Sequence, residues 1–174
     1  IRSCLVGSEM CIRDRLADIP NTCASAIKAV KDLKLNYITI HLSSGLEAIK
    51  AAKKVSGMTK LAGVTILTSL DNKSLREIGY NKDLKKIVLD QAKLAQKAKL
   101  DALVCSPMEI KVVRKVFKKE IITPGIRLPG HSSDDQKRVM TPKQAFQNGA
   151  TTLVMGRSLI TVSYTHLTLP TSPK

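Results

Sequence analysis

The sequence predicts an α/β fold built on a parallel sheet. Short apolar runs rich in β-branched residues alternate with amphipathic segments, which is the pattern of repeated βα units. The apolar runs are nearly continuous, as expected for strands that are covered on both faces. With 174 residues, 43% of them hydrophobic, the chain is long enough for one domain with a sizeable core.

Five strands are expected in the middle of the chain. They are residues 37–42, 63–67, 102–105, 121–123 and 152–155. A helix over about residues 21–33 precedes the first of them and would follow a further strand. Closing a parallel barrel takes eight strands, so the expected strands are too few for a closed barrel.

The helices between the strands carry start signals. Three segments match a capping box, in which a Ser or Thr and a Glu or Gln three residues later bond to the backbone. They are residues 44–47, 106–109 and 141–144, and Pro follows the first residue in the last two. From residue 83 to 99, apolar residues recur at helical spacing with lysines opposite, which predicts a helix covering the sheet.

Composition limits the classes of partner. A formal net charge of +15 would suit an anionic partner, but only 3% of residues are aromatic, so the stacking surfaces of single-strand binders are missing. We therefore expect solvated lysines and no nucleic-acid partner. Cys4, Cys11, Cys23 and Cys105 show no metal-binding spacing, and Cys105 is interpreted as a small buried residue. Without a membrane-length apolar stretch or a secretory signal, we expect no membrane association and a cytoplasmic location.

Both ends of the chain differ from its middle. Residues 1–15 (IRSCLVGSEMCIRDR) and 162–174 (VSYTHLTLPTSPK) show neither helical nor strand periodicity. Both are similar to peptides translated from sequencing adapters, and we interpret them as a foreign leader and a foreign tail. A genuine disordered tail is the alternative. The domain is then expected to span residues 16–161.

Two stretches place glycine and arginine directly after a strand. In TTLVMGR (151–157), the glycine lets backbone amides approach a phosphate, and the arginine offers a bidentate charge. TPGIR (123–127) leads into a polar loop over residues 128–138, whose length is typical of an active-site lid. In parallel barrels phosphate often binds after the last two strands. Together these stretches predict a phosphate site.

A family resemblance then becomes specific. The stretches VTILTS (64–69), LDALVCSP (100–107), TPGIR (123–127), DQKRVMTP (135–142) and LVMGR (153–157) resemble bacterial orotidine 5′-monophosphate decarboxylases in order and spacing. The resemblance implies an incomplete (β/α)8 TIM barrel that lacks about the first two to three strands and the last helix. It implies conversion of orotidine 5′-monophosphate (OMP) to UMP and CO2 in pyrimidine biosynthesis. It also implies no metal or organic cofactor, and a homodimer whose sites are shared between subunits.

The family's central motif, Asp-x-Lys-x-x-Asp-Ile-x-Asn-Thr, is only half present. DIPNT (18–22) matches its second part, whereas Arg13 and Arg15 stand where the first Asp and the catalytic Lys belong. The pKa of arginine stays above ~12, so Arg15 cannot deliver a proton and the chain is expected to be nearly inactive. The resemblance implies a catalytic role for Asp18. It implies substrate contacts by Ile19, Thr22, Thr68, Arg127, Gln136, Gly156 and Arg157.

Other polar residues have blander interpretations. His41 lies where the family often has His, but a packed, hydrogen-bonded imidazole is the simpler expectation. Asp134 and Asp135 are interpreted as solvated loop charges. The alternative functions are another phosphate-binding barrel enzyme, of the 3-keto-gulonate phosphate decarboxylase or pentose-phosphate epimerase type, and a non-catalytic basic binding module.

Overall fold

The computed structural model describes residues 3–6, 9–127 and 139–155, with side chains from Leu16 onward. The strands are β1 (Ser3–Val6), β2 (Glu9–Leu16), β3 (Tyr37–His41), β4 (Lys60–Val64), β5 (Ala102–Val104), β6 (Glu120–Thr123) and β7 (Thr152–Leu153). The α-helices are α1 (Pro20–Ala29), α2 (Gly45–Val55), α3 (Asn72–Glu77), α4 (Leu84–Lys97), α5 (Ile110–Val113) and α6 (Pro142–Asn148). Two 3₁₀ turns, η1 (Lys31–Leu33) and η2 (Leu42–Ser44), complete the described elements.

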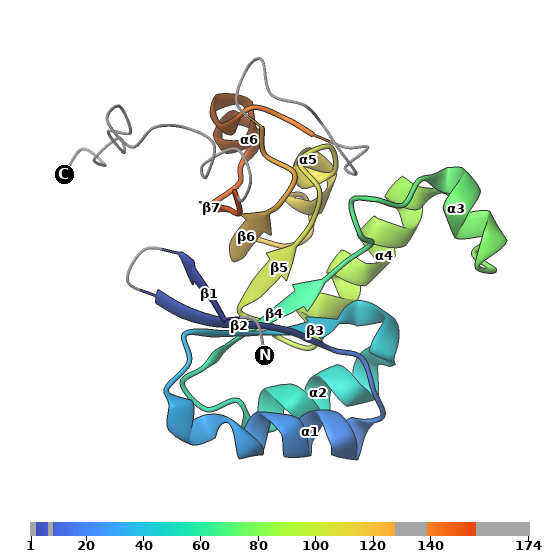
Figure 1. Cartoon of the computed structure of the whole chain (residues 1–174). Helices are drawn as coiled ribbons and strands as arrows, with labels where there is room; N and C mark the ends of the chain where they lie inside the picture. The colour runs from blue at the N-terminus through green and yellow to red at the C-terminus, as the bar shows by residue number, and fades with distance from the viewer. Residues whose placement is uncertain (1–2, 7–8, 128–138, 156–174) are drawn as a thin grey trace, which may run out of the picture.

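The strands form one sheet whose spatial order follows the chain, from β1 to β7 (Figure 1). β1 is antiparallel to β2, and from β2 to β7 each strand is parallel to the next. Within the described residues no ladder joins β7 back to β1, so the sheet is open. Helices α1 and α2 lie side by side along it (Figure 1). The prediction of an α/β fold with a parallel sheet is confirmed.

The five predicted strands correspond to β3 through β7, with shifted ends. β4 begins at Lys60 rather than at residue 63 and leaves the ladder after Val64. β7 ends at Leu153 rather than at residue 155. Lys60 begins the strand because it pairs with Tyr37 of the neighbouring β3, and its side chain donates to Tyr37 and to Glu120 of β6. A search for apolar runs does not detect such a residue.

Residues 1–15, whose sequence shows no periodicity, contain regular structure. β1 and most of β2 lie in this segment as an antiparallel hairpin, and β2 also pairs with β3. The register shifts between Ile12 and Arg15. Such an irregularity interrupts the alternation by which a strand is recognised in sequence, and pairing with a neighbouring strand overrides weak local preference.

Two of the predicted helix starts are confirmed, and the capping boxes predicted at two others are not found. α4 follows the predicted pattern, and the Asp83 carboxylate caps its start by accepting from the Lys85 amide. α6 has the predicted capping box between Thr141 and Gln144. The capping box predicted at Ser44 is wrong, because its side chain makes no capping bond to α2. Ser106 Oγ accepts from the Met108 amide at 3.3 Å, which caps a turn ahead of α5 rather than the helix itself.

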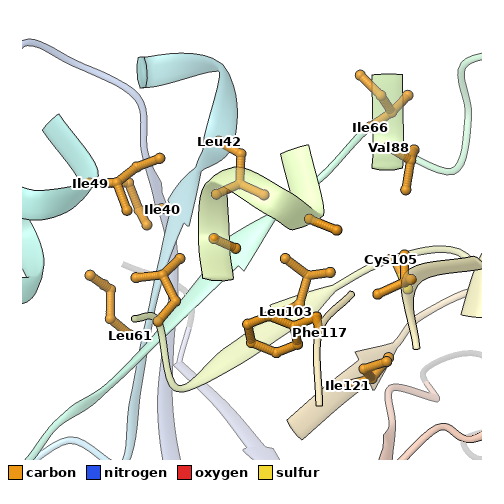
Figure 2. Packing of buried hydrophobic residues seen from close by; sticks show 14 of the residues in the cluster. Ile40, Leu42, Ile49, Leu61, Ile66, Val88, Leu103, Cys105, Phe117 and Ile121 are labelled. Atoms are coloured by element: carbon orange, nitrogen blue, oxygen red, sulfur yellow. The ribbon is translucent and has the colours of Figure 1, made fainter. Parts of the chain in front are cut away.

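The core has two parts because side chains alternate between the faces of a strand. The larger cluster packs the helices onto one face. Figure 2 shows Ile49 of α2 near Ile40 and Leu61 of the strands, and Val88 of α4 near Ile66. Cys105 belongs to this cluster and is 1% exposed, as expected. A smaller cluster on the other face consists of Tyr37, Ala62 and Ala102, with Val104 and Ile122 packed against them.

Candidate functional site

The predicted site residues follow the carboxyl ends of the parallel strands. Asp18 comes two residues after β2, His41 ends β3, Thr68 follows β4, and Arg127 follows β6. Because these strands are parallel, their carboxyl ends meet at one edge of the sheet, where ligands of parallel α/β folds bind. We call this edge the carboxyl edge.

The segment after β2 presents polar and apolar groups to solvent. Asp18 is exposed, and its Oδ1 accepts the Ile19 amide at 2.7 Å. The thiol of Cys23, which is fully buried, donates to the Asp18 carbonyl at 3.2 Å and fastens this turn to α1. Ile19 is 66% exposed, and Thr22 is exposed on the first turn of the helix.

Arg13 and Arg15 belong to β2. They are the residues for which the resemblance predicts an Asp and a Lys. In the backbone register, Arg15 is the partner of Thr39 on β3. Arg13 lies in the irregular stretch between Ile12 and Arg15. Arg15 is thus one residue before the end of β2. That it occupies the position of a catalytic lysine stays a prediction.

Thr68 lies in a turn that continues from β4. The preceding residues stay close to β5, since both the amide and the hydroxyl of Thr65 donate to the Val104 carbonyl, at 3.0 and 2.8 Å. Thr68 itself is half-buried in the turn between β4 and α3. It therefore lies at the carboxyl edge, and its contact with a bound ring stays a prediction.

Arg127 is a buried charge held at the base of the predicted lid. Its exposed fraction is 9%, and its guanidinium Nη1 donates to the Ile126 carbonyl at 3.0 Å. The Arg127 amide donates to the Met140 carbonyl, and the Met140 amide donates to the Gly125 carbonyl. Gly125 has a φ of +80°, a conformation that favours glycine. The backbone on either side of residues 128–138 is therefore joined by two hydrogen bonds next to the buried guanidinium of Arg127.

Three predicted contacts, Gln136, Gly156 and Arg157, lie outside the described residues, as do Asp134 and Asp135. The strands that lead toward them can be compared. β6 and β7 are adjacent and parallel, with Ile122 paired to Thr152 and Thr123 paired to Leu153. The required arrangement of the strands is present, and the convergence of the three residues on one anion stays a prediction.

Sequence reasoning missed a polar cluster at the opposite edge of the sheet. Tyr37, Lys60, Glu120 and Thr152 are joined by side-chain hydrogen bonds. Each of these residues is the first residue of its strand. A polar residue repeatedly placed just ahead of an apolar run was the signal that could have revealed it.

Two kinds of site have no support in the described part of the chain. Its helices include none that is both long and apolar enough to cross a membrane. Nor do the same residues gather three or more His, Cys, Asp or Glu side chains in an arrangement that could hold a metal ion.

Comparison with known sequences identifies relatives of this chain. A model of the orotidine 5′-phosphate decarboxylase / HUMPS family matches residues 15–163. Orotidine 5′-phosphate decarboxylase of Prochlorococcus marinus is 45% identical over 154 residues, covering 82% of this chain and 64% of that protein. The protein of the same name from Wolbachia pipientis is 44% identical over 150 residues, covering 83% and 66%. The chain thus spans 64% of the length of the Prochlorococcus relative.

Solved structures agree with the sequence relatives. Orotidine 5′-phosphate decarboxylase from Lactobacillus acidophilus matches with a TM-score of 0.70 at 33% identity, over 82% of this chain and 64% of that one. The enzyme of that name from Thermotoga maritima matches with a TM-score of 0.61 at 25% identity, over 83% and 63%. The open parallel sheet is consequently an incomplete (β/α) barrel. The chain belongs to the orotidine 5′-phosphate decarboxylase / HUMPS family.

Proposed function

We propose that the carboxyl edge of this sheet binds a pyrimidine nucleoside monophosphate, with OMP as the substrate and UMP as the product of the family reaction. One observation carries the proposal: β6 and β7 are adjacent and parallel, and the loop after β6 holds a buried Arg127. Thr68 at the same edge would contact the pyrimidine. Gln136, Gly156 and Arg157 would hold the phosphate, as their sequence positions suggest.

The same proposal includes a homodimer and a cytoplasmic location. Asp18, Ile19 and Thr22 are exposed on one turn at the carboxyl edge. In a shared site, these residues would enter the pocket of the neighbouring subunit. The high exposure of Ile19 supports such a contact, because burial of its side chain against a partner would be favourable.

The chemistry expected of this chain is limited by Arg15. Loss of CO2 leaves negative charge on the pyrimidine ring, which a nearby cation stabilises before a proton is delivered to carbon. A lysine ammonium can perform both steps. Arginine can supply the charge but holds its proton too tightly to give it up. We therefore propose that the chain binds nucleotide and does not turn it over at an enzymatic rate.

We also propose that residues 1–15 and 162–174 are foreign to the domain. The family match over residues 15–163 supports boundaries close to these positions. Most of β2 lies in residues 1–15, and this strand nevertheless pairs with β3 of the sheet.

Titration with UMP tests nucleotide binding. UMP should bind the chain, whereas ribose 5-phosphate should compete poorly and a single-stranded oligonucleotide should not displace it. Thr68→Val should weaken UMP binding about fivefold through loss of one hydrogen bond, and Ser69→Ala, at the exposed neighbouring position, should not change it. Equal binding of ribose 5-phosphate would favour a sugar-phosphate enzyme. Salt-sensitive oligonucleotide binding unaffected by UMP would favour a basic binding module.

The absorbance of OMP tests turnover separately. The chain should decarboxylate OMP at least about a thousandfold more slowly than a relative that has the catalytic lysine, because Arg15 supplies charge but cannot deliver the proton. A rate within tenfold of such a relative would show that Arg15 is not the limiting residue.

A further inference from the structure

The edge of the sheet opposite the carboxyl edge holds a hydrogen-bonded network. The network consists of Tyr37, Lys60, Glu120 and Thr152, which begin strands β3, β4, β6 and β7. Glu120 is its centre, because its carboxylate accepts from all three of the others. Tyr37 Oη donates to Glu120 Oε1 at 2.7 Å, Thr152 Oγ1 donates to Oε1 at 3.0 Å, and Lys60 Nζ donates to Oε2 at 3.2 Å.

The network spans β5, although no polar side chain of β5 takes part in it. At this level β5 supplies Ala102, which packs with Tyr37 and Ala62 and is fully buried. Because the side chains of Ala62 and Ala102 are small, the phenol of Tyr37 can extend from β3 to Glu120 on β6. Lys60 lies over the ring of Tyr37, 5.0 Å from its centroid, and also donates to its hydroxyl at 3.0 Å. The four strands are therefore joined by side chains as well as by the ladder.

β7 depends on such side-chain bonds more than the other strands do. It has two residues, and its ladder to β6 has two pairs. Beyond the ladder, the Val154 amide donates to the Thr123 carbonyl at 2.9 Å, and the Thr151 hydroxyl bonds to the backbone of Ile121. The bond from Thr152 to Glu120 is the link between this short strand and the network.

We propose that Glu120 is a positioning residue that connects β7 to β3 and β4 and thereby sets where the carboxyl end of β7 lies. The consequence for nucleotide binding rests on the function proposed above, since β7 leads to the carboxyl edge. The consequence for β7 itself does not depend on that function. Glu120 acts at the far edge of the sheet and does not contact the ligand.

Hydrogen exchange of single amides in the full chain tests the connection. Thr152→Val keeps the shape of the side chain and removes the hydroxyl that donates to Glu120. The Val154 amide should then exchange about tenfold faster, because a hydrogen bond to a carboxylate is lost. Thr152→Ser restores a hydroxyl and should stay within about twofold of the parent. The Thr65 amide, which donates to Val104 between β4 and β5, serves as the internal reference and should not change.

Binding of UMP to these variants, and to Tyr37→Phe, tests the consequence for the site. Thr152→Val and Tyr37→Phe should weaken UMP binding several-fold, whereas Thr152→Ser should bind UMP like the parent. Unchanged exchange at Val154, or equal acceleration at Val154 and Thr65, would overturn the positioning role. Faster exchange without any change in UMP affinity would overturn the link to the site. If the parent chain binds no UMP, the proposed function fails, and the exchange of Val154 still decides the role of Glu120.

Discussion

At the scale of single residues, the chain's two phenylalanines offer a matched comparison of burial. Phe117 is fully buried in the larger cluster, and Phe146 on α6 is 50% exposed. Phe117→Ala should lower the free energy of unfolding by about 3–5 kcal/mol, because the cavity adds to the lost transfer free energy. Phe146→Ala should cost less than about 1 kcal/mol. Urea unfolding of both variants measures this, and similar losses would contradict the assigned core.

Single residues also show what a sequence can and cannot reveal about the site. TPGIR and the glycine–arginine pair were recognisable because each follows an apolar run, and these runs contain β6 and β7. DIPNT was recognisable only through its resemblance to the family motif. The buried state of Arg127 was not predictable, because it depends on how Met140 returns beside Gly125 from beyond the loop. Such contacts between distant segments leave no local pattern.

At the scale of elements, two helix starts with similar sequences behave differently. Thr141 has an extended backbone (φ −74°, ψ 155°), and its hydroxyl accepts from the Gln144 amide in a complete capping box. Ser44 is already helical (φ −65°, ψ −10°) because it ends the 3₁₀ turn η2, so its hydroxyl cannot reach the first amides of α2. A capping side chain needs the extended conformation, which the sequence pattern alone does not report.

This difference predicts opposite outcomes for the same substitution. Thr141→Ala should destabilise the chain by about 1 kcal/mol through loss of the cap. Ser44→Ala should be neutral or slightly stabilising, because the Ser44 hydroxyl is buried and has no hydrogen-bond partner. The midpoints of urea denaturation compare the two directly. A cost at Ser44 equal to that at Thr141 would show that the sequence motif, and not the backbone geometry, determines capping.

At the scale of the whole molecule, the order of the strands in the sheet was easier to predict than the irregular pairing and the side-chain contacts between strands. Alternating apolar and amphipathic segments predicted the parallel sheet, and the observed order follows the chain from β2 to β7. The hairpin of β1 and β2 was missed because an irregular register hides its alternation. The network around Glu120 was missed because its four residues are distant in sequence and meet only when the sheet forms.

The network also predicts how the stability of the whole sheet responds to alkali. Burial raises the pKa of the Tyr37 phenol, against the opposing effect of the hydrogen bond from Lys60. The pKa of Lys60 is also raised, first by its hydrogen bond to Tyr37 and then by that to Glu120. Both shifts favour the protonated forms in the folded chain. Their contribution is therefore complete below the unfolded-state values of about 10 and is lost as the pH rises above them.

Urea unfolding between pH 8 and pH 11 measures this response. The parent chain should lose stability above about pH 10. Tyr37→Phe should be less stable at pH 8 and should give a flatter profile, because it removes the titrating phenol and the first cause of the raised Lys60 pKa. Tyr80→Phe, at a half-buried tyrosine outside the network, is the matched control and should follow the parent. A pH effect that does not involve the network would instead change all three profiles alike. Parallel profiles for Tyr37→Phe and the parent would therefore mean that the network does not hold the sheet together in alkali.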